Sequence, residues 1–91
     1  MYELKFTPKA NEGLERLKKS GEVQALNKLA TLLKELKIHP THGTGKPEKL
    51  TGNLSGKWSR RITKKHRLIY EIFDEVVTVE VLQVYGHYDD K

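Results

Sequence analysis

The chain opens with an alternating segment that leads directly into a helix start. Over residues 2–7 polar positions alternate with apolar ones, which share one face of an extended strand: Tyr2, Leu4 and Phe6. Thr7 and Pro8 follow, and threonine is a good N-cap residue while proline is favoured at the first helical position. We therefore predict a short strand over residues 2–7 and a helix that begins at Pro8.

Two helices are predicted by apolar residues spaced three and four positions apart. The first has a stripe that consists of Ala10, Leu14 and Leu17, and Ser20-Gly21 ends it. The second keeps the helical period through Val23, Leu26, Leu29, Ala30, Leu33 and Leu36. It stops at His39-Pro40, because the residue before a proline is disfavoured in a helix. We expect an antiparallel helical hairpin that lies on a sheet and whose leucines form core.

Glycine and proline recur from Thr41 to Gly56, which predicts a long loop. Three strands are predicted after it, over residues 57–63, 67–73 and 76–85, separated by polar turns. The predicted fold class is α+β. It consists of an N-terminal strand, a two-helix hairpin and an antiparallel β-meander.

The first strand of this meander alternates strictly. Trp58, Arg60 and Ile62 fall on one face, and Ser59, Arg61 and Thr63 fall on the other. Trp58 has two interpretations, either stacking on a nucleic-acid base or packing in the core.

Length and composition limit the classes of protein to which the chain can belong. With 91 residues, the chain is expected to form a single domain over residues 1–91. It has no cysteine, which excludes a disulfide framework and a thiolate metal site. No apolar run approaches the roughly 18 residues that span a bilayer, and the first residues lack the apolar centre of a signal peptide. We expect a cytoplasmic protein that has no membrane partner.

Positive charge is concentrated in the middle of the chain. The net charge is +5, and residues 36–70 hold nine lysines and arginines but only one carboxylate, Glu48. A concentrated basic surface attracts polyanions and speeds association with nucleic acid. The alternative is a solvated face that only keeps the protein soluble.

Glu48 is the first candidate for chemistry, since a carboxylate can accept a proton from a reacting hydroxyl group. Lys46 and Lys49 flank it on the glycine- and proline-containing loop, so an exposed salt-bridge partner is the alternative. Arg61 and Arg67 lie on neighbouring predicted strands joined by a tight turn, so both could face one surface. Their forked donors match phosphate oxygens and could stabilise a pentavalent phosphorane. The alternative is surface charge that protects a sheet edge.

His87 and Tyr88 follow the last predicted strand. Histidine titrates near neutral pH and can donate a proton to a leaving 5′-oxygen. Tyr88 could stack on a base or orient the phosphate. On their own the two residues are weak evidence. No metal is expected, because His39 and His42 straddle Pro40 and no third ligand has a suitable spacing.

Three motifs together resemble the YoeB/Txe family of bacterial toxins, within the RelE/ParE superfamily. They are G-K-P-E at 45–48, N-L-S-G-x-W-S-R-R-I-T at 53–63 and H-R-L-x-Y at 66–70, with His87-Tyr88 further on. The resemblance is densest over residues 45–70, and the order of elements extends it over nearly the whole chain. It implies a small sheet with two helices. It also implies an mRNA endonuclease that acts in the ribosomal A site and is held inactive by a co-encoded antitoxin.

The resemblance assigns roles residue by residue. Glu48 matches the general base that deprotonates the RNA 2′-hydroxyl, and His87, with Tyr88 beside it, matches the general acid. Arg67 matches the residue that stabilises the phosphate in the transition state, and Arg61 matches a further phosphate contact. The implied reaction needs no metal or other cofactor and yields a 2′,3′-cyclic phosphate, which requires RNA because DNA lacks the nucleophile.

The remaining expected contacts hold RNA and the ribosome. They are Lys46, Lys49, Trp58, Arg60, Lys64 and Lys65. The implied partners are the 70S ribosome with its mRNA and an antitoxin whose acidic, initially disordered segment covers the basic face. Family members also form homodimers, an assembly for which this sequence carries no signal. Family chains commonly end at or just after the His-Tyr pair, whereas this sequence continues with Asp89, Asp90 and Lys91.

Two alternatives stay open. One is a superfamily relative that poisons another target, such as DNA gyrase, without cutting RNA. The other is a non-catalytic module that binds RNA or the ribosome through the same basic face. The joint presence of Glu48, Arg67 and His87 argues against the first.

Overall fold

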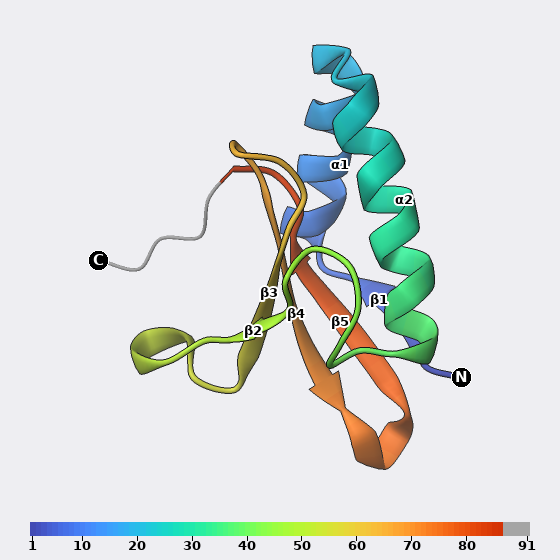
Figure 1. Cartoon of the computed structure of the whole chain (residues 1–91), viewed down its shortest axis with the longest axis vertical. Helices are drawn as coiled ribbons and strands as arrows, with labels where there is room; N and C mark the ends of the chain where they lie inside the picture. The colour runs from blue at the N-terminus through green and yellow to red at the C-terminus, as the bar shows by residue number, and fades with distance from the viewer. Residues whose placement is uncertain (87–91) are drawn as a thin grey trace.

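Two helices cover one face of a five-stranded sheet in the computed structural model, which describes residues 1–86 (Figure 1). The helices are α1 (Pro8–Ser20) and α2 (Val23–Ile38). The strands are β1 (Glu3–Phe6), β2 (Glu48–Lys49), β3 (Lys57–Arg61), β4 (Arg67–Phe73) and β5 (Thr78–Gln83). Single 3₁₀ turns occupy Gly52–Leu54 and Asp74–Val76. The predicted order of strand, two helices and meander is therefore confirmed.

The sheet is mixed, with the strand order β1-β5-β4-β3-β2. β2 pairs antiparallel with β3, β3 with β4 and β4 with β5, as in a meander. β1 pairs parallel to β5 through the register Glu3↔Thr78 to Phe6↔Val81. The helical hairpin connects β1, at one edge of the sheet, to β2 at the other edge. The meander then runs back across the sheet, so that β5 pairs with β1.

Local chemistry fixes α1 at both ends, as predicted. The Thr7 hydroxyl accepts a hydrogen bond from the N–H of Ala10 at 3.1 Å, and Pro8 occupies the first turn. Gly21 ends the helix with a φ of 72°, a left-handed conformation that glycine adopts without steric cost. α2 continues to Ile38, directly before the predicted stop at His39-Pro40.

The core lies between the helices and the sheet. In α2 its buried stripe is Ala25, Leu29, Leu32 and Leu36, at spacings of four, three and four. The expectation that the helical leucines form core is confirmed, since those not fully buried pack against it: Leu14, Leu26 and Leu33. Val23 and Ala30, also predicted on this stripe, lie beside it and are exposed.

The structure departs from the sequence prediction mainly in the length of strands. The predicted loop over residues 41–56 contains the short strand β2, which exists because it pairs with β3. The last strand is shorter than the predicted 76–85, because a 3₁₀ turn ends at Val76 and Val77 has a φ of 48°. None of the helices in residues 1–86 is long and apolar enough to cross a membrane.

Candidate active site

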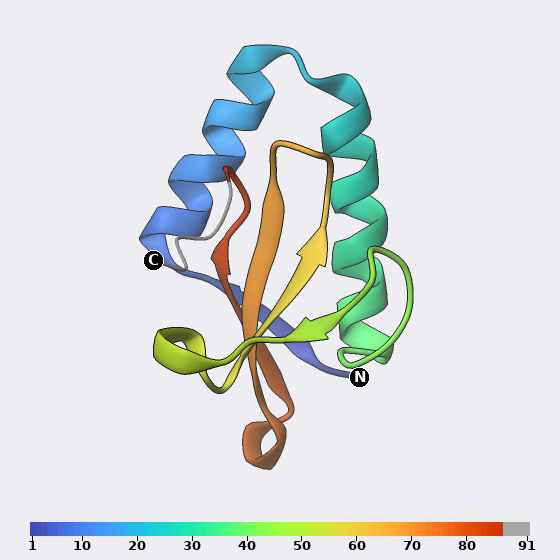
Figure 2. The ribbon, with the colours of Figure 1, turned by 60° about the vertical axis from the view of Figure 1, so that its left-hand side comes forward.

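Strand register places three of the predicted site residues on one face of the sheet. Arg61 of β3 lies directly opposite Arg67 of β4, and Glu48 of β2 lies opposite Ser59 of β3. Directly paired residues share a face, and so do residues two apart on one strand. Glu48, Arg61 and Arg67 therefore share one face of the sheet. It is the face turned away from the helices, because the neighbouring Arg60 points to α2, and we call it the open face. Figure 2 shows that both helices lie on the other side of the sheet.

Arg61 and Arg67 form a close pair of like charges. The backbones of the two residues are not hydrogen-bonded to each other. The N–H of Arg61 donates to Gly45 O at 2.7 Å, and the N–H of Arg67 donates to Gly86 O at 2.9 Å. Such a non-hydrogen-bonded pair has Cα atoms roughly 4.5 Å apart. Within residues 1–86 neither arginine pairs with a carboxylate. Because like charges directly opposite repel, the pair favours an anion between the two guanidinium groups.

The Arg67 side chain is held in place for such a role. Its Nη1 donates to the carbonyl of Thr63 at 3.1 Å, across the turn between β3 and β4. Arg67 is half-buried, whereas Arg61 is exposed. The remaining donors of the Arg67 fork are left for an external acceptor, since this guanidinium makes no other hydrogen bond or ion pair within residues 1–86.

Glu48 presents its carboxylate from the edge of the same face. Its side chain is exposed and makes no hydrogen bond or ion pair within the described part of the chain. Its backbone is fixed by the pairing of β2 with β3, and the N–H of Leu50 donates to Lys57 O at 2.9 Å. Arg61 is its diagonal neighbour across the ladder, which separates the Cα atoms by roughly 7–8 Å. A carboxylate that can accept a proton and two guanidinium groups that can bind an anion thus share one surface.

His87 and Tyr88 lie outside the described residues. The described chain ends at Gly86, whose carbonyl accepts the N–H of Arg67. The chain therefore reaches residue 86 directly beside the arginine pair.

The other predicted contacts are dispersed. Lys46, Lys64 and Lys65 are exposed, the last two in the turn between β3 and β4. Lys49 is exposed but pairs with Trp58, so both point to the face opposite Glu48. Trp58 is half-buried and packs against the core. The structure does not bring Lys49 and Trp58 together with Glu48, and for Trp58 it supports packing rather than stacking on a base.

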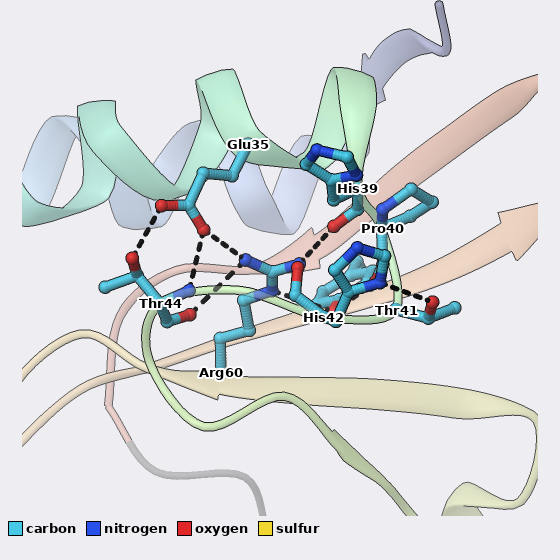
Figure 3. Close-up of polar contacts among 8 residues, drawn as sticks. Glu35, His39, Pro40, Thr41, His42, Thr44 and Arg60 are labelled. Atoms are coloured by element: carbon cyan, nitrogen blue, oxygen red, sulfur yellow. Dashed lines mark hydrogen bonds and ion pairs between the residues drawn. The ribbon is translucent and has the colours of Figure 1, made fainter.

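Arg60, expected to contact RNA, is instead buried beneath the sheet, with 0% of its surface exposed. All five N–H groups of its guanidinium have acceptors (Figure 3). These acceptors are the Tyr70 hydroxyl (3.0 Å), Glu35 Oε1 (2.9 Å) and the carbonyls of His39, His42 (3.0 Å) and Thr44 (3.3 Å). The expectation for Arg60 was wrong, because its strand position points it toward α2.

The Arg60 network ties down the loop that leads to Glu48. The Glu35 carboxylate accepts from the backbone N–H of Thr44 at 2.8 Å and from its hydroxyl at 2.6 Å. The Tyr70 hydroxyl donates to Pro40 O at 2.8 Å. The Thr44 hydroxyl, its N–H and the Arg60 guanidinium hold the pKa of Glu35 below its usual range, although burial opposes them. Burial raises the pKa of Tyr70.

The sequence held one signal for this network. Arg60 shares its strand face with Trp58 and Ile62, and that alternation indicates a side chain directed toward the core. Nothing in the spacing of Glu35 or Tyr70 identifies them as its partners. No cluster of three or more His, Cys, Asp or Glu residues that could hold a metal ion occurs within residues 1–86.

The chain is similar to known bacterial toxins in sequence and in fold. A family model described as "YoeB-like toxin of bacterial type II toxin-antitoxin system" matches residues 6–88. Toxin YoeB of Escherichia coli K12 is 46% identical over 54 residues, which are 59% of this chain and 64% of that protein. The alignment thus spans just under two thirds of that relative's length.

Solved structures extend the similarity over nearly the whole chain. The YoeB/ParE toxin from Agrobacterium tumefaciens has a TM-score of 0.87 at 34% identity, covering 94% of this chain and 99% of that one. The toxin chain of a YoeB-YefM complex from Staphylococcus aureus has a TM-score of 0.80 at 32% identity, covering 97% and 99%. A YoeB dimer from the same organism has a TM-score of 0.81 at 33% identity, covering 96% and 98%.

Proposed function

Because this chain belongs to the YoeB-like toxin family of bacterial type II toxin–antitoxin systems, we propose that it is a toxin that cleaves mRNA on the ribosome. The observation that carries the proposal is the arrangement on the open face, where Glu48 of β2, Arg61 of β3 and Arg67 of β4 lie on three successive strands. A phosphodiester would relieve the repulsion between the two guanidinium groups. The carboxylate would then lie within reach of the adjacent ribose.

In the proposed reaction, Glu48 removes the proton of a 2′-hydroxyl, and the 2′-oxygen attacks the neighbouring phosphorus. Arg67 and Arg61 donate hydrogen bonds to the non-bridging oxygens, on which negative charge develops. The bond to the 5′-oxygen breaks, and His87 donates the proton that this oxygen takes up. Tyr88 orients the phosphate. The products are a 2′,3′-cyclic phosphate and a free 5′-hydroxyl, and the chain's own side chains supply every proton transfer.

The cationic side chains around the site have a second, less specific role in this proposal. Lys46, Lys64 and Lys65 are exposed and are therefore accessible to the phosphates of mRNA and of the ribosome. Contacts of this kind raise affinity for polyanions without reading sequence, and they weaken as salt increases.

The partners follow from the relatives. The S. aureus relative was solved in a YoeB-YefM complex and also as a dimer. We propose that this chain is a single toxin domain that acts in the bacterial cytoplasm. It binds an antitoxin whose acidic segment folds over the open face and neutralises its arginines. Self-association as a homodimer is the second proposed assembly.

Substitution of Glu48 tests the function. Glu48→Gln keeps the size and polarity of the side chain but cannot accept the proton, so cleavage should fall by about 10²–10⁴-fold. The measurement is primer extension on mRNA bound to purified 70S ribosomes, with analysis of the product ends. Glu75→Gln is the matched control, because Glu75 is an exposed carboxylate in the turn between β4 and β5, away from the site.

Two outcomes would contradict the proposal. Equal cleavage by wild type and Glu48→Gln would remove Glu48 from the chemistry. Growth arrest by wild type with no mRNA cuts would instead favour a non-cleaving poison of gyrase or a module that only binds RNA or the ribosome.

A further inference from the structure

His66 is a buried titratable residue that the proposed mechanism does not use. It lies between β3 and β4, and only 2% of its surface is exposed. Both ring nitrogens are engaged by other segments of the chain. Nε2 lies 3.0 Å from Glu22 Oε1, between α1 and α2, and Nδ1 accepts the backbone N–H of Gly86 at 2.8 Å.

These contacts select one protonation form of the ring. A backbone N–H can only donate, so Nδ1 must offer a lone pair and the ring proton must be on Nε2, which donates to Glu22. Glu22 is itself fixed, because the Ser20 hydroxyl donates to its other oxygen at 2.8 Å. The Ser20 hydroxyl and His66 hold the pKa of Glu22 below its usual range, so Glu22 is a charged acceptor at neutral pH.

Other residues also contact the segment that His66 holds, which consists of Tyr85 and Gly86. The carbonyl of Gly86 accepts the N–H of Arg67 at 2.9 Å. The ring of Tyr85 lies against that of His66, with centroids 4.5 Å apart, and the guanidinium of Arg16 lies 4.3 Å from the Tyr85 centroid. A Cβ on Gly13 of α1 would lie 3.0 Å from Tyr85 Cβ, so the absence of a side chain there allows this close approach.

We propose that His66 is a positioning residue, which fixes Gly86, the residue before His87, against the backbone of Arg67. The inference rests on the proposed function, in which His87 is the general acid. One uninterrupted set of contacts runs from Glu22 through His66 to Gly86 and Arg67, so the residue that precedes the proposed general acid is held against the strand of the phosphate-binding arginine. Loss of the Nδ1 contact releases Gly86, whereas the Arg67 guanidinium keeps its separate hydrogen bond to the carbonyl of Thr63.

Two substitutions separate the contacts of His66. Asn places an oxygen near the position of Nδ1 and can accept from Gly86, but it does not reach Glu22. Gln places its amide near the position of Nε2 and can donate to Glu22, but it leaves the N–H of Gly86 without an acceptor. Each variant keeps one of the two hydrogen bonds, and a purely structural role predicts that activity follows the loss of stability in both.

A positioning role predicts different kcat values for the two variants. His66→Gln should lower kcat for ribosome-bound mRNA by about 10–100-fold with little change in KM, because a displaced catalytic group costs rate rather than binding. His66→Asn should retain kcat within about threefold, since it keeps the positioning contact. Both are measured beside wild type and His87→Ala, with thermal unfolding of each.

Hydrogen exchange gives a readout that needs no ribosome. In wild type the amide of Gly86 should exchange far more slowly than an unprotected amide, because it is hydrogen-bonded to a buried ring. That protection should persist in His66→Asn and disappear in His66→Gln. Rapid exchange at Gly86 in wild type would overturn the proposal even if both variants failed to fold.

The outcomes also separate this proposal from the proposed function. If wild type cleaves, His87→Ala does not, and the two His66 variants have equal kcat, the positioning role is wrong and the function stands. If wild type makes no cuts, the function fails and the inference fails with it.

Discussion

Two adjacent arginines, Arg60 and Arg61, have opposite fates because a strand alternates its side chains. Arg60 points to α2 and is fully buried among five acceptors, whereas Arg61 is exposed on the open face beside Arg67. The first therefore contributes to stability. Arg61 instead lowers stability, because it lies opposite a like charge, and its proposed role is to bind phosphate.

Substitution of each arginine by methionine should show this division. Arg60→Met should lower the free energy of unfolding by about 3 kcal/mol, because it leaves Glu35 and buried carbonyls without their donor. Arg61→Met should change the free energy of unfolding by less than about 0.5 kcal/mol, as is usual for an exposed site. Urea denaturation measures both.

The same pair separates stability from activity. Arg61→Met should reduce mRNA cleavage by about 10–100-fold, since it removes a donor to the developing charge. A large loss of stability in Arg61→Met, or none in Arg60→Met, would contradict the assignment of one arginine to the core and the other to the open face.

At the scale of elements, the loop before β2 is held by an ion pair that depends on pH. Thr44 and Arg60 lower the pKa of Glu35 in the folded protein. A lowered folded pKa contributes stability that is fully present above the unfolded value of about 4.3 and is lost as pH falls through the folded value.

Glu35→Gln should therefore flatten the acid limb of stability. Between pH 7 and pH 5 the free energy of unfolding should change by the same amount in both proteins, because Glu35 stays ionised throughout this range. Below about pH 4.3 it should fall more steeply in wild type than in Glu35→Gln, which has no proton to gain. Chemical denaturation at a series of pH values measures the slopes, and parallel curves would show that Glu35 does not contribute.

Local signals in the sequence predicted most elements but not their pairing. Capping residues and helical period located α1 and α2, and the strand predicted over residues 67–73 matches β4. β2 has only two residues and no pattern of its own, so it depends on β3. The parallel pairing of β1 with β5 joins residues more than 70 positions apart, which no local pattern encodes.

The same limit applies to the candidate site. Alternation and a tight turn were enough to place Arg61 and Arg67 on one surface, but Glu48 joins them only through β2. The H-R-L-x-Y motif includes His66 but does not reveal its contacts, because its partners come from the turn between the helices and from Gly86, which follows β5. His87 and Tyr88 stay predictions from resemblance.

At the scale of the whole molecule, the helices cover one face of the sheet and leave the other uncovered (Figure 2). The covered face contains the core and the Arg60 network, which stiffen the strands. The open face presents Glu48 and the arginine pair. A rigid layer beneath and reactive groups above suit the proposed toxin, since cleavage requires groups from three strands to keep their spacing.

The most direct test of the central claim removes the nucleophile from the substrate. The cut site is first mapped on mRNA bound to 70S ribosomes, and one 2′-deoxynucleotide is then placed on the 5′ side of the cleaved bond. The account predicts that this cut disappears, and that cuts in unmodified mRNA leave a 2′,3′-cyclic phosphate and a 5′-hydroxyl. Cleavage of the deoxy-substituted mRNA at the unmodified rate would contradict it.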